Sequence, residues 1–160
     1  RETLAQVFEG HAGVAVLPLP TEKNIHPWWT ALAVADAPKV ISRLPFAGVG
    51  NVRGEPMGAL AIARLPQEPT GRDRTLLAIE TTEPMSRDGL SEVLDRAKIQ
   101  PHFTVSVRQN ATMHLVELAD FVTKDDSRFE LLEARDAVLR THIIGYYAEI
   151  LAAEDFSPSK

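Results

Sequence analysis

The order of strand and helix patterns between residues 73 and 151 constrains the fold of this sequence most strongly. Four strand patterns lie at 75–79, 103–108, 113–121 and 142–147. One helix pattern follows a capping residue at Ser86, and a second begins at Ser127 and extends to Leu139. The resulting order, β-α-β-β-α-β, predicts a ferredoxin-like sheet with both helices on one face. The other face needs a cover, and we expect a partner to supply it.

Residues 1–66 have a different texture, with many prolines and both tryptophans. Their patterns predict a helix at 2–9, a strand at 13–18, a helix at 27–35 and strands at 40–44 and 59–65. The run from Val14 to Leu17 is apolar without alternation, which predicts a strand buried on both faces. A helix over 27–35 cannot turn both Trp28 and Trp29 inward, so we expect one ring at an interface.

A linker is predicted between the two regions, because residues 66–72 combine turn formers with charges. The chain is therefore expected to be α+β. A small partial α/β lobe occupies residues 1–66 and is followed by a ferredoxin-like domain at 73–151. The sequence also starts inside an amphipathic helix pattern, so we expect it to belong to a longer protein with a further domain upstream.

The composition excludes several classes of function. Hydrophobic residues make up 44% of the chain and the net charge is −5, which is typical of a soluble globular protein without a nucleic-acid-binding surface. The absence of cysteine excludes disulfides and thiolate metal sites and favours a cytoplasmic location. No apolar run approaches the roughly 20 residues that span a membrane.

No metal site or cofactor is expected from the histidines. The five histidines are scattered along the chain. His102 and His114 could oppose each other across a turn at Asn110, but two histidines without a carboxylate are a weak metal signal. We therefore interpret them as packing residues of the strands.

Several stretches carry a family resemblance. The stretches GRDRTLLAIETTEP, RDGLSEVL, FTVSVRQ and IIGYY stand in the order of the matching segments of an ACT domain. More narrowly, this part resembles the ACT domain that ends prephenate dehydratases. Upstream, LAQVFEGHAGVAVLPLPTE and KVISRLPF are similar to the dehydratase segment around its Glu-Asn-Ser motif and to the strand that follows. The resemblance implies a protein of aromatic amino-acid biosynthesis, with a chorismate mutase domain upstream.

The departures from this family concern catalysis. Residues 20–22 read Pro-Thr-Glu where the dehydratases have Glu-Asn-Ser, and residues 57–59 read Met-Gly-Ala where they have Thr-Arg-Phe. Dehydration with decarboxylation needs a proton donor and a cation beside the substrate carboxylates. Met57, Gly58 and Ala59 supply neither, so we predict no catalytic residue and interpret residues 1–66 as a degenerate dehydratase lobe.

The resemblance also implies an effector site at a dimer interface, between the first helix and a neighbouring strand. The matching positions are Arg87, Asp88, Gly89 and Leu90, facing Ser106, Val107 and Arg108. The N–H groups of a helix N-terminus suit a carboxylate, and Arg108 could clamp one. However, Asp88 places a negative charge where the family has a glycine, and it also suits a first helical turn. An effector site and a structural remnant therefore both stay open.

The leading hypothesis is a regulatory or assembly module that acts as a homodimer. Phenylalanine or tyrosine is the implied effector, and its binding would shift the population of dimer arrangements. One alternative is a divergent prephenate dehydratase that has relocated its catalytic groups. Another is a dimerisation domain without a ligand, attached to a chorismate mutase.

Overall fold

The computed structural model describes residues 2–24, 26–46, 58–108 and 112–150. Within these ranges the chain is a mixed α+β structure built on one seven-stranded sheet, in the order β1-β3-β2-β7-β4-β6-β5. Its elements are α1 (Glu2–Phe8), β1 (Val14–Pro18), the 3-10 helix η1 (Trp28–Leu32), β2 (Lys39–Leu44), β3 (Ala59–Ala63), β4 (Asp73–Thr81), α2 (Arg87–Arg96), β5 (Phe103–Arg108), β6 (Thr112–Ala119), α3 (Ser127–Glu133) and β7 (Val138–Ala148). Over the same ranges, no helix has the length and apolarity needed to cross a bilayer.

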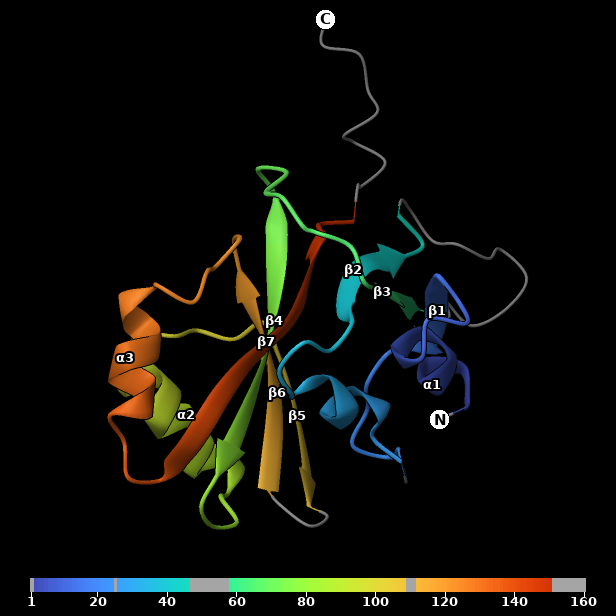
Figure 1. The fold of residues 1–160 in the computed structure, drawn as a ribbon. Coiled ribbons are helices and arrows are strands. Elements are labelled where there is room, and N and C mark those ends of the chain that lie inside the picture. The colour runs from blue at the N-terminus through green and yellow to red at the C-terminus, as the bar shows by residue number, and fades with distance from the viewer. Residues whose placement is uncertain (1, 25, 47–57, 109–111, 151–160) are drawn as a thin grey trace, which may run out of the picture.

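The larger part of the sheet consists of β7, β4, β6 and β5, and adjacent strands among these four are antiparallel. Helices α2 and α3 lie beside each other on one face of it (Figure 1). Leu90 and Leu94 of α2 and Leu132 of α3 pack there with alternate residues of the strands. As predicted, Ser86 caps α2, since its hydroxyl accepts a hydrogen bond from the Gly89 N–H at 3.1 Å.

The opposite face of these strands is covered by the first region of the same chain and not, as expected, by a partner. Leu4 and Val7 of α1 and Trp29 and Leu32 of η1 join a second buried cluster with residues of β4, β5, β6 and β7. Figure 1 shows α1 beside β1, on the other side of the sheet from α2 and α3. A homodimer stays a prediction, and a second copy would meet the edges of the sheet rather than this covered face.

The helix predicted at 27–35 is shorter than expected, because the structure has only η1, a 3-10 helix of five residues, and the expectation that only one tryptophan ring turns inward is wrong. Both rings are buried: Trp29 lies in the apolar cluster, and Trp28 donates from Nε1 to the Pro18 carbonyl oxygen at 3.0 Å. Trp29 thus lies in the buried cluster that joins the first region to the larger part of the sheet, which agrees with the expectation of one ring at an interface.

The predicted position of one strand and the predicted end of one helix are also corrected. Strand β1 is an edge strand, not a strand buried on both faces, and Val14 and Val16 are 50% and 52% exposed. Helix α3 ends at Glu133, so Val138 and Leu139 belong to β7 instead of to that helix. A turn separates the two elements, with the Val138 N–H donating to the Arg135 carbonyl oxygen at 2.8 Å.

The junction between the three-stranded and four-stranded parts is a short parallel contact of β2 with β7. Its register joins Val40 to Gly145. The predicted linker reinforces this contact, because the Gln67 side-chain amide donates to the carbonyl oxygens of Val40 and Tyr146 at 2.8 and 2.9 Å. Residues 66–72 are thus bonded to both parts of the sheet, and the division into two domains stays a prediction.

We expect Gly145→Ala to destabilise the protein by about 3 kcal/mol or more. Gly145 has a φ of +151°, and a Cβ there would lie 2.2 Å from the Val40 carbonyl oxygen, where backbone cannot move aside. Urea unfolding measures the loss. The matched control is Gly13→Ala, because a Cβ at Gly13 meets nothing within 4 Å. Equal stabilities of the two variants would contradict the close approach.

Candidate functional site

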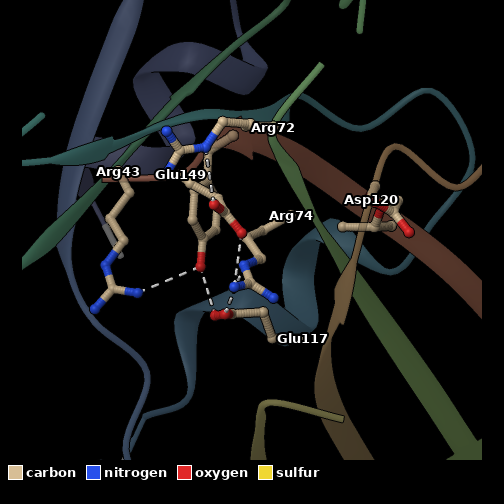
Figure 2. A network of polar contacts seen from close by, with 8 residues as sticks. Arg43, Arg72, Arg74, Glu117, Asp120 and Glu149 are labelled. Carbon is tan, nitrogen blue, oxygen red and sulfur yellow. Dashed lines mark hydrogen bonds and ion pairs between the residues drawn. The ribbon is translucent and has the colours of Figure 1, made fainter. Parts of the chain in front are cut away.

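A cluster of charged residues lies where the first region meets the larger sheet (Figure 2). We call it the arginine–glutamate cluster. It consists of Arg43 on β2, Arg72, Arg74 on β4, Glu117 on β6, and Tyr147 and Glu149 at the end of β7. Strand alternation and register bring these side chains together, since Tyr147 is the Cα partner of Arg74 and Glu117 is the partner of Leu76.

The buried centre of the cluster is a tyrosine–carboxylate pair. The Tyr147 hydroxyl donates to Glu117 Oε2 at 2.5 Å, and these residues are only 4% and 9% exposed. Burial, and then the hydrogen bond to the Glu117 carboxylate, raise the pKa of Tyr147 above that of a free tyrosine. Arg43 lies over the same ring, with its Cζ 5.9 Å from the centroid and its Nη1 3.4 Å from the hydroxyl. Tyr147 is therefore protonated at neutral pH and acts as a hydrogen-bond donor.

Arg72 and Arg74 of the cluster pair with its glutamates. Arg74 pairs with Glu149 at 2.7 Å and lies 4.0 Å from Glu117, and Arg72 also reaches Glu149 at 3.4 Å. Two buried nitrogens, Nε of Arg43 and Nη1 of Arg74, have no hydrogen-bond partner in the part of the chain that the structure describes. Buried donors of this kind favour an acceptor from outside the cluster.

Two cavities adjoin these donors. One, of about 250 Å³, is lined by Arg43, Arg74, Glu117, Tyr147, Glu149 and Ile150. The other, of about 40 Å³, is mostly apolar and is lined by Leu19, Pro20, Arg43, Leu60, Leu76, Phe103, Leu115, Glu117 and Tyr147. The smaller cavity has space for about three water molecules. Together they offer donors for a carboxylate, acceptors for an ammonium group and an apolar recess.

The residues predicted for an effector site lie at one end of the sheet. Thr112 is the Cα partner of both Thr81, where β4 ends before α2, and Arg108, where β5 ends. The first turn of α2 and the end of β5 therefore share this end of the sheet. The proposed dimer site formed by them stays a prediction, because it depends on a second copy.

Most of the seven residues of the predicted effector site already have a contact within the chain. Arg87 and Glu22 form an exposed ion pair at 2.7 Å, and the Gly89 N–H is bonded to the cap of α2. Leu90 is buried in the cluster under the helices, and Val107 packs against the opposite cluster. Asp88 lies in the first turn of α2 and is exposed, as is Arg108 at the end of β5.

Ser106 has a buried histidine as its partner. Its hydroxyl lies 2.7 Å from His114 Nδ1, and His114 is fully buried. Burial, and then the charge of Arg108, lower the pKa of His114. The prediction that His102 and His114 oppose each other is therefore wrong. His114 faces Ser106 across the strands, and the main-chain N–H of His102 donates to the Glu117 carbonyl oxygen. In the described ranges, no group of three or more metal-binding side chains occurs.

The positions of the two dehydratase motifs lie next to each other. Pro18 is the Cα partner of Ala59, and the Leu19 N–H donates to the Gly58 carbonyl oxygen at 3.3 Å. Met57 and the Asn110 turn lie outside the described residues. Packing is tight here, because a Cβ at Gly58 would lie 2.4 Å from Leu19 Cδ1. Leu19 instead lines the small apolar cavity beside the arginine–glutamate cluster.

Sequence reasoning missed the arginine–glutamate cluster because its members are far apart in the chain. Arg43 and Tyr147 are separated by 104 positions. One signal was available: Glu117 shares a strand face with Leu115, and a charged residue on an apolar strand face needs a buried partner. The identity of that partner depends on the register of four strands.

The fold defines the class of similar proteins more clearly than the sequence does. No protein-family model matches the sequence, and no curated protein matches it significantly. One solved structure with a similar fold is described as "GqqA- a novel type of quorum quenching acylases". It has 18% identity and a TM-score of 0.61, and the match covers 92% of this chain and 78% of that one.

A second similar structure is that of a prephenate dehydratase from Streptococcus mutans. Its identity is 13% and its TM-score 0.58, over 92% of this chain and 80% of the dehydratase chain. The fold is thus similar to that of a prephenate dehydratase, in agreement with the resemblance seen in the sequence. At these identities the similarity concerns the fold alone.

We expect Tyr147→Phe to lower the free energy of unfolding by about 1–3 kcal/mol, because Glu117 would keep its buried carboxylate and lose a donor. The neighbouring Tyr146→Phe is the matched control. The Tyr146 ring stacks on Phe121 with centroids 4.0 Å apart, and that contact survives the change. The control should stay within about 0.5 kcal/mol of the parent. Urea unfolding decides, and a larger loss in the control would contradict the prediction.

The raised pKa of Tyr147 also predicts a dependence on pH. Its contribution to stability is complete below the pKa of an unfolded tyrosine, 10.0, and decreases as the pH rises above it, because the unfolded state loses its proton first. Unfolding free energies should therefore fall above about pH 10. Tyr147→Phe should flatten this decline more than Tyr146→Phe, and an unchanged decline would contradict the assignment.

Proposed function

We propose that this chain is a regulatory module that binds an amino acid with an apolar side chain at the arginine–glutamate cluster. One observation carries the proposal: Arg43 and Arg74 both line the 250 Å³ cavity, and each keeps a buried nitrogen without a hydrogen-bond partner in the described ranges. A carboxylate accepts hydrogen bonds from arginine more strongly than a neutral group does. An anionic group in this cavity would pair with the guanidinium groups of Arg43 and Arg74, which line it.

The remaining walls fit the rest of an amino acid. Glu117 and Glu149 offer carboxylates for an ammonium group at the same cavity. The ring of the side chain would lie in the larger cavity, because the 40 Å³ apolar cavity, which shares Arg43, Glu117 and Tyr147 with it, is too small for a benzene ring. Because the fold is similar to that of a prephenate dehydratase, phenylalanine and tyrosine are the first candidates.

The regulatory role belongs to the same proposal. The chain order β-α-β-β-α-β and the strand order β7-β4-β6-β5 support a ferredoxin-like unit of the ACT type. Such a unit would pair with a second copy through an edge of the sheet, and β5 is an edge strand with Phe103 38% exposed. Ligand binding would then favour one dimer arrangement and bias a chorismate mutase domain upstream. The lack of cysteine supports a cytoplasmic protein.

Thermal stability measured with phenylalanine, tyrosine, tryptophan and prephenate tests the proposal. A ligand at 100 times its dissociation constant stabilises the folded state by about 2.7 kcal/mol. We expect a shift with an aromatic amino acid, lost in Arg43→Gln. Arg96→Gln is the control, because Arg96 is an exposed arginine of α2 whose partner is Glu92. If Arg108→Gln abolishes the shift and Arg43→Gln does not, the ligand occupies the predicted dimer site instead.

One alternative has support from the same cavity. Two arginines with incomplete hydrogen bonding could also hold the two carboxylates of prephenate. A divergent dehydratase would then convert prephenate, and Arg43→Gln would abolish the turnover. Absence of both turnover and any ligand-induced shift would favour a dimerisation domain without a ligand.

A further inference from the structure

A second and larger cavity lies on the other side of the β2–β7 junction. Its volume is about 810 Å³. The walls come from the segment before β2, the end of β3, α3 and the first half of β7. Lys39, Lys124 and His142 contribute polar groups, and Phe129 and Tyr146 contribute rings. We call this cavity the lysine cleft. It shares no lining residue with the 250 Å³ cavity at the arginine–glutamate cluster.

The positive groups of the lysine cleft line the same cavity, and the charge of Lys124 affects the pKa of both Lys39 and His142. Lys39 Nζ donates to the Ile143 carbonyl oxygen at 2.7 Å, which uses one of its three N–H groups. Burial and then the charge of Lys124 lower the pKa of Lys39. The pKa of His142 is lowered by burial and then by the charges of Arg140 and Lys39, whereas Glu80 raises it and Lys124 lowers it by a smaller amount. An anion between these groups would relieve their mutual repulsion.

His142 supplies an independent observation. Its Nε2 is buried and has no hydrogen-bond partner in the ranges that the structure describes. If Nε2 carries the proton of the neutral ring, it is an unpaired donor that an anion could accept from. If Nε2 is bare, an approaching anion would favour its protonation, because a nearby negative charge raises the pKa of a histidine.

The acidic residues of the cleft do not cancel this preference. Glu133 accepts a hydrogen bond from the Thr141 hydroxyl. Asp36 affects the pKa of Lys39 less than Lys124 does. Arg64, a third cation on the wall, holds the Asp36 carbonyl oxygen through Nη1 at 2.5 Å. Three cations against two carboxylates leave the wall with an excess of positive charge.

We propose that the lysine cleft binds a small organic dianion. Its charged end would lie between Lys39, Lys124 and His142, and its apolar body would lie against Phe129 and Tyr146. Phosphate is the charged group that lysine ammonium groups and imidazole bind well as point donors. The cleft is also large enough for an organic body, since ligand pockets are commonly about 300–1,000 Å³. Nothing in this proposal depends on the ligand of the arginine–glutamate cluster.

Titration calorimetry with four probes tests the charge and the body of the ligand. Phenyl phosphate should bind most tightly, inorganic phosphate more weakly because it lacks a ring, and benzoate most weakly because it has one charge. Phenylmalonate distinguishes a dicarboxylate from a phosphate with the same ring and similar charge. Benzoate binding as tightly as both dianions, or no binding by any probe, would overturn the proposal.

Matched variants locate the binding. Lys124→Gln should raise the dissociation constant of phenyl phosphate about tenfold, the effect of losing one charged hydrogen bond. Lys23→Gln removes the same charge from an exposed residue outside the cleft and should leave the constant unchanged. Equal weakening by both variants would mean general charge attraction and would overturn the site.

Histidine ring signals in NMR spectra give a second readout. The signals of His142, identified by their loss in His142→Gln, should move on titration with phenyl phosphate, whereas those of exposed His11 should not. Arg43→Gln should leave phenyl phosphate binding unchanged even if it abolishes binding of an amino acid. If Arg43→Gln abolishes phenyl phosphate binding, the anion occupies the arginine–glutamate cluster and the lysine cleft is not its site.

Discussion

The close approach of the Gly145 backbone to the Val40 backbone is the contact on which the arrangement of the sheet depends. A Cβ at Gly145 would lie 2.2 Å from the Val40 carbonyl oxygen, so only glycine allows β2 and β7 to meet. Their register contains this one pair, and it unites a three-stranded part with a four-stranded part. Both candidate sites border it. On β2, Lys39 precedes Val40 and Arg43 follows it, and each lines a different cavity.

The shortness of this contact explains why polar groups gather there. Strands that pair briefly and then diverge leave backbone carbonyl groups without a neighbouring strand, and such groups need other donors. Lys39 supplies one to the Ile143 carbonyl oxygen, and Gln67 supplies one each to Val40 and Tyr146. Divergence also opens space on both sides of the contact. The long polar side chains of Lys39 and Gln67 occupy that space. Apolar side chains in their place would leave the carbonyl groups of Ile143, Val40 and Tyr146 without these donors.

Local patterns in the sequence predicted much of the fold and little of the site. Ser86 as a cap and alternation along β5 and β6 depend on neighbours in the chain and are confirmed. Whether an apolar run such as Val14–Leu17 lies at the edge or the centre of a sheet depends on strand order, which local patterns do not contain. Val138 could continue a helical stripe or begin a strand, and a turn at 134–137 decides. The arginine–glutamate cluster could not be predicted from local patterns at all, because the register of four strands brings its members together.

The incomplete hydrogen bonding of Arg43 and Arg74 argues for binding rather than for stability. Networks of buried charge contribute little to stability unless every group is paired, and unpaired donors lower it. Departures of this kind from local consistency are expected at functional sites. The segment that carries the Glu-Asn-Ser motif in dehydratases here supplies Leu19 and Pro20 to the apolar cavity beside these arginines. The fold is similar to that of an enzyme, yet the described positions of its catalytic motifs contribute here to packing, beside an apolar cavity and two arginines with incomplete hydrogen bonding.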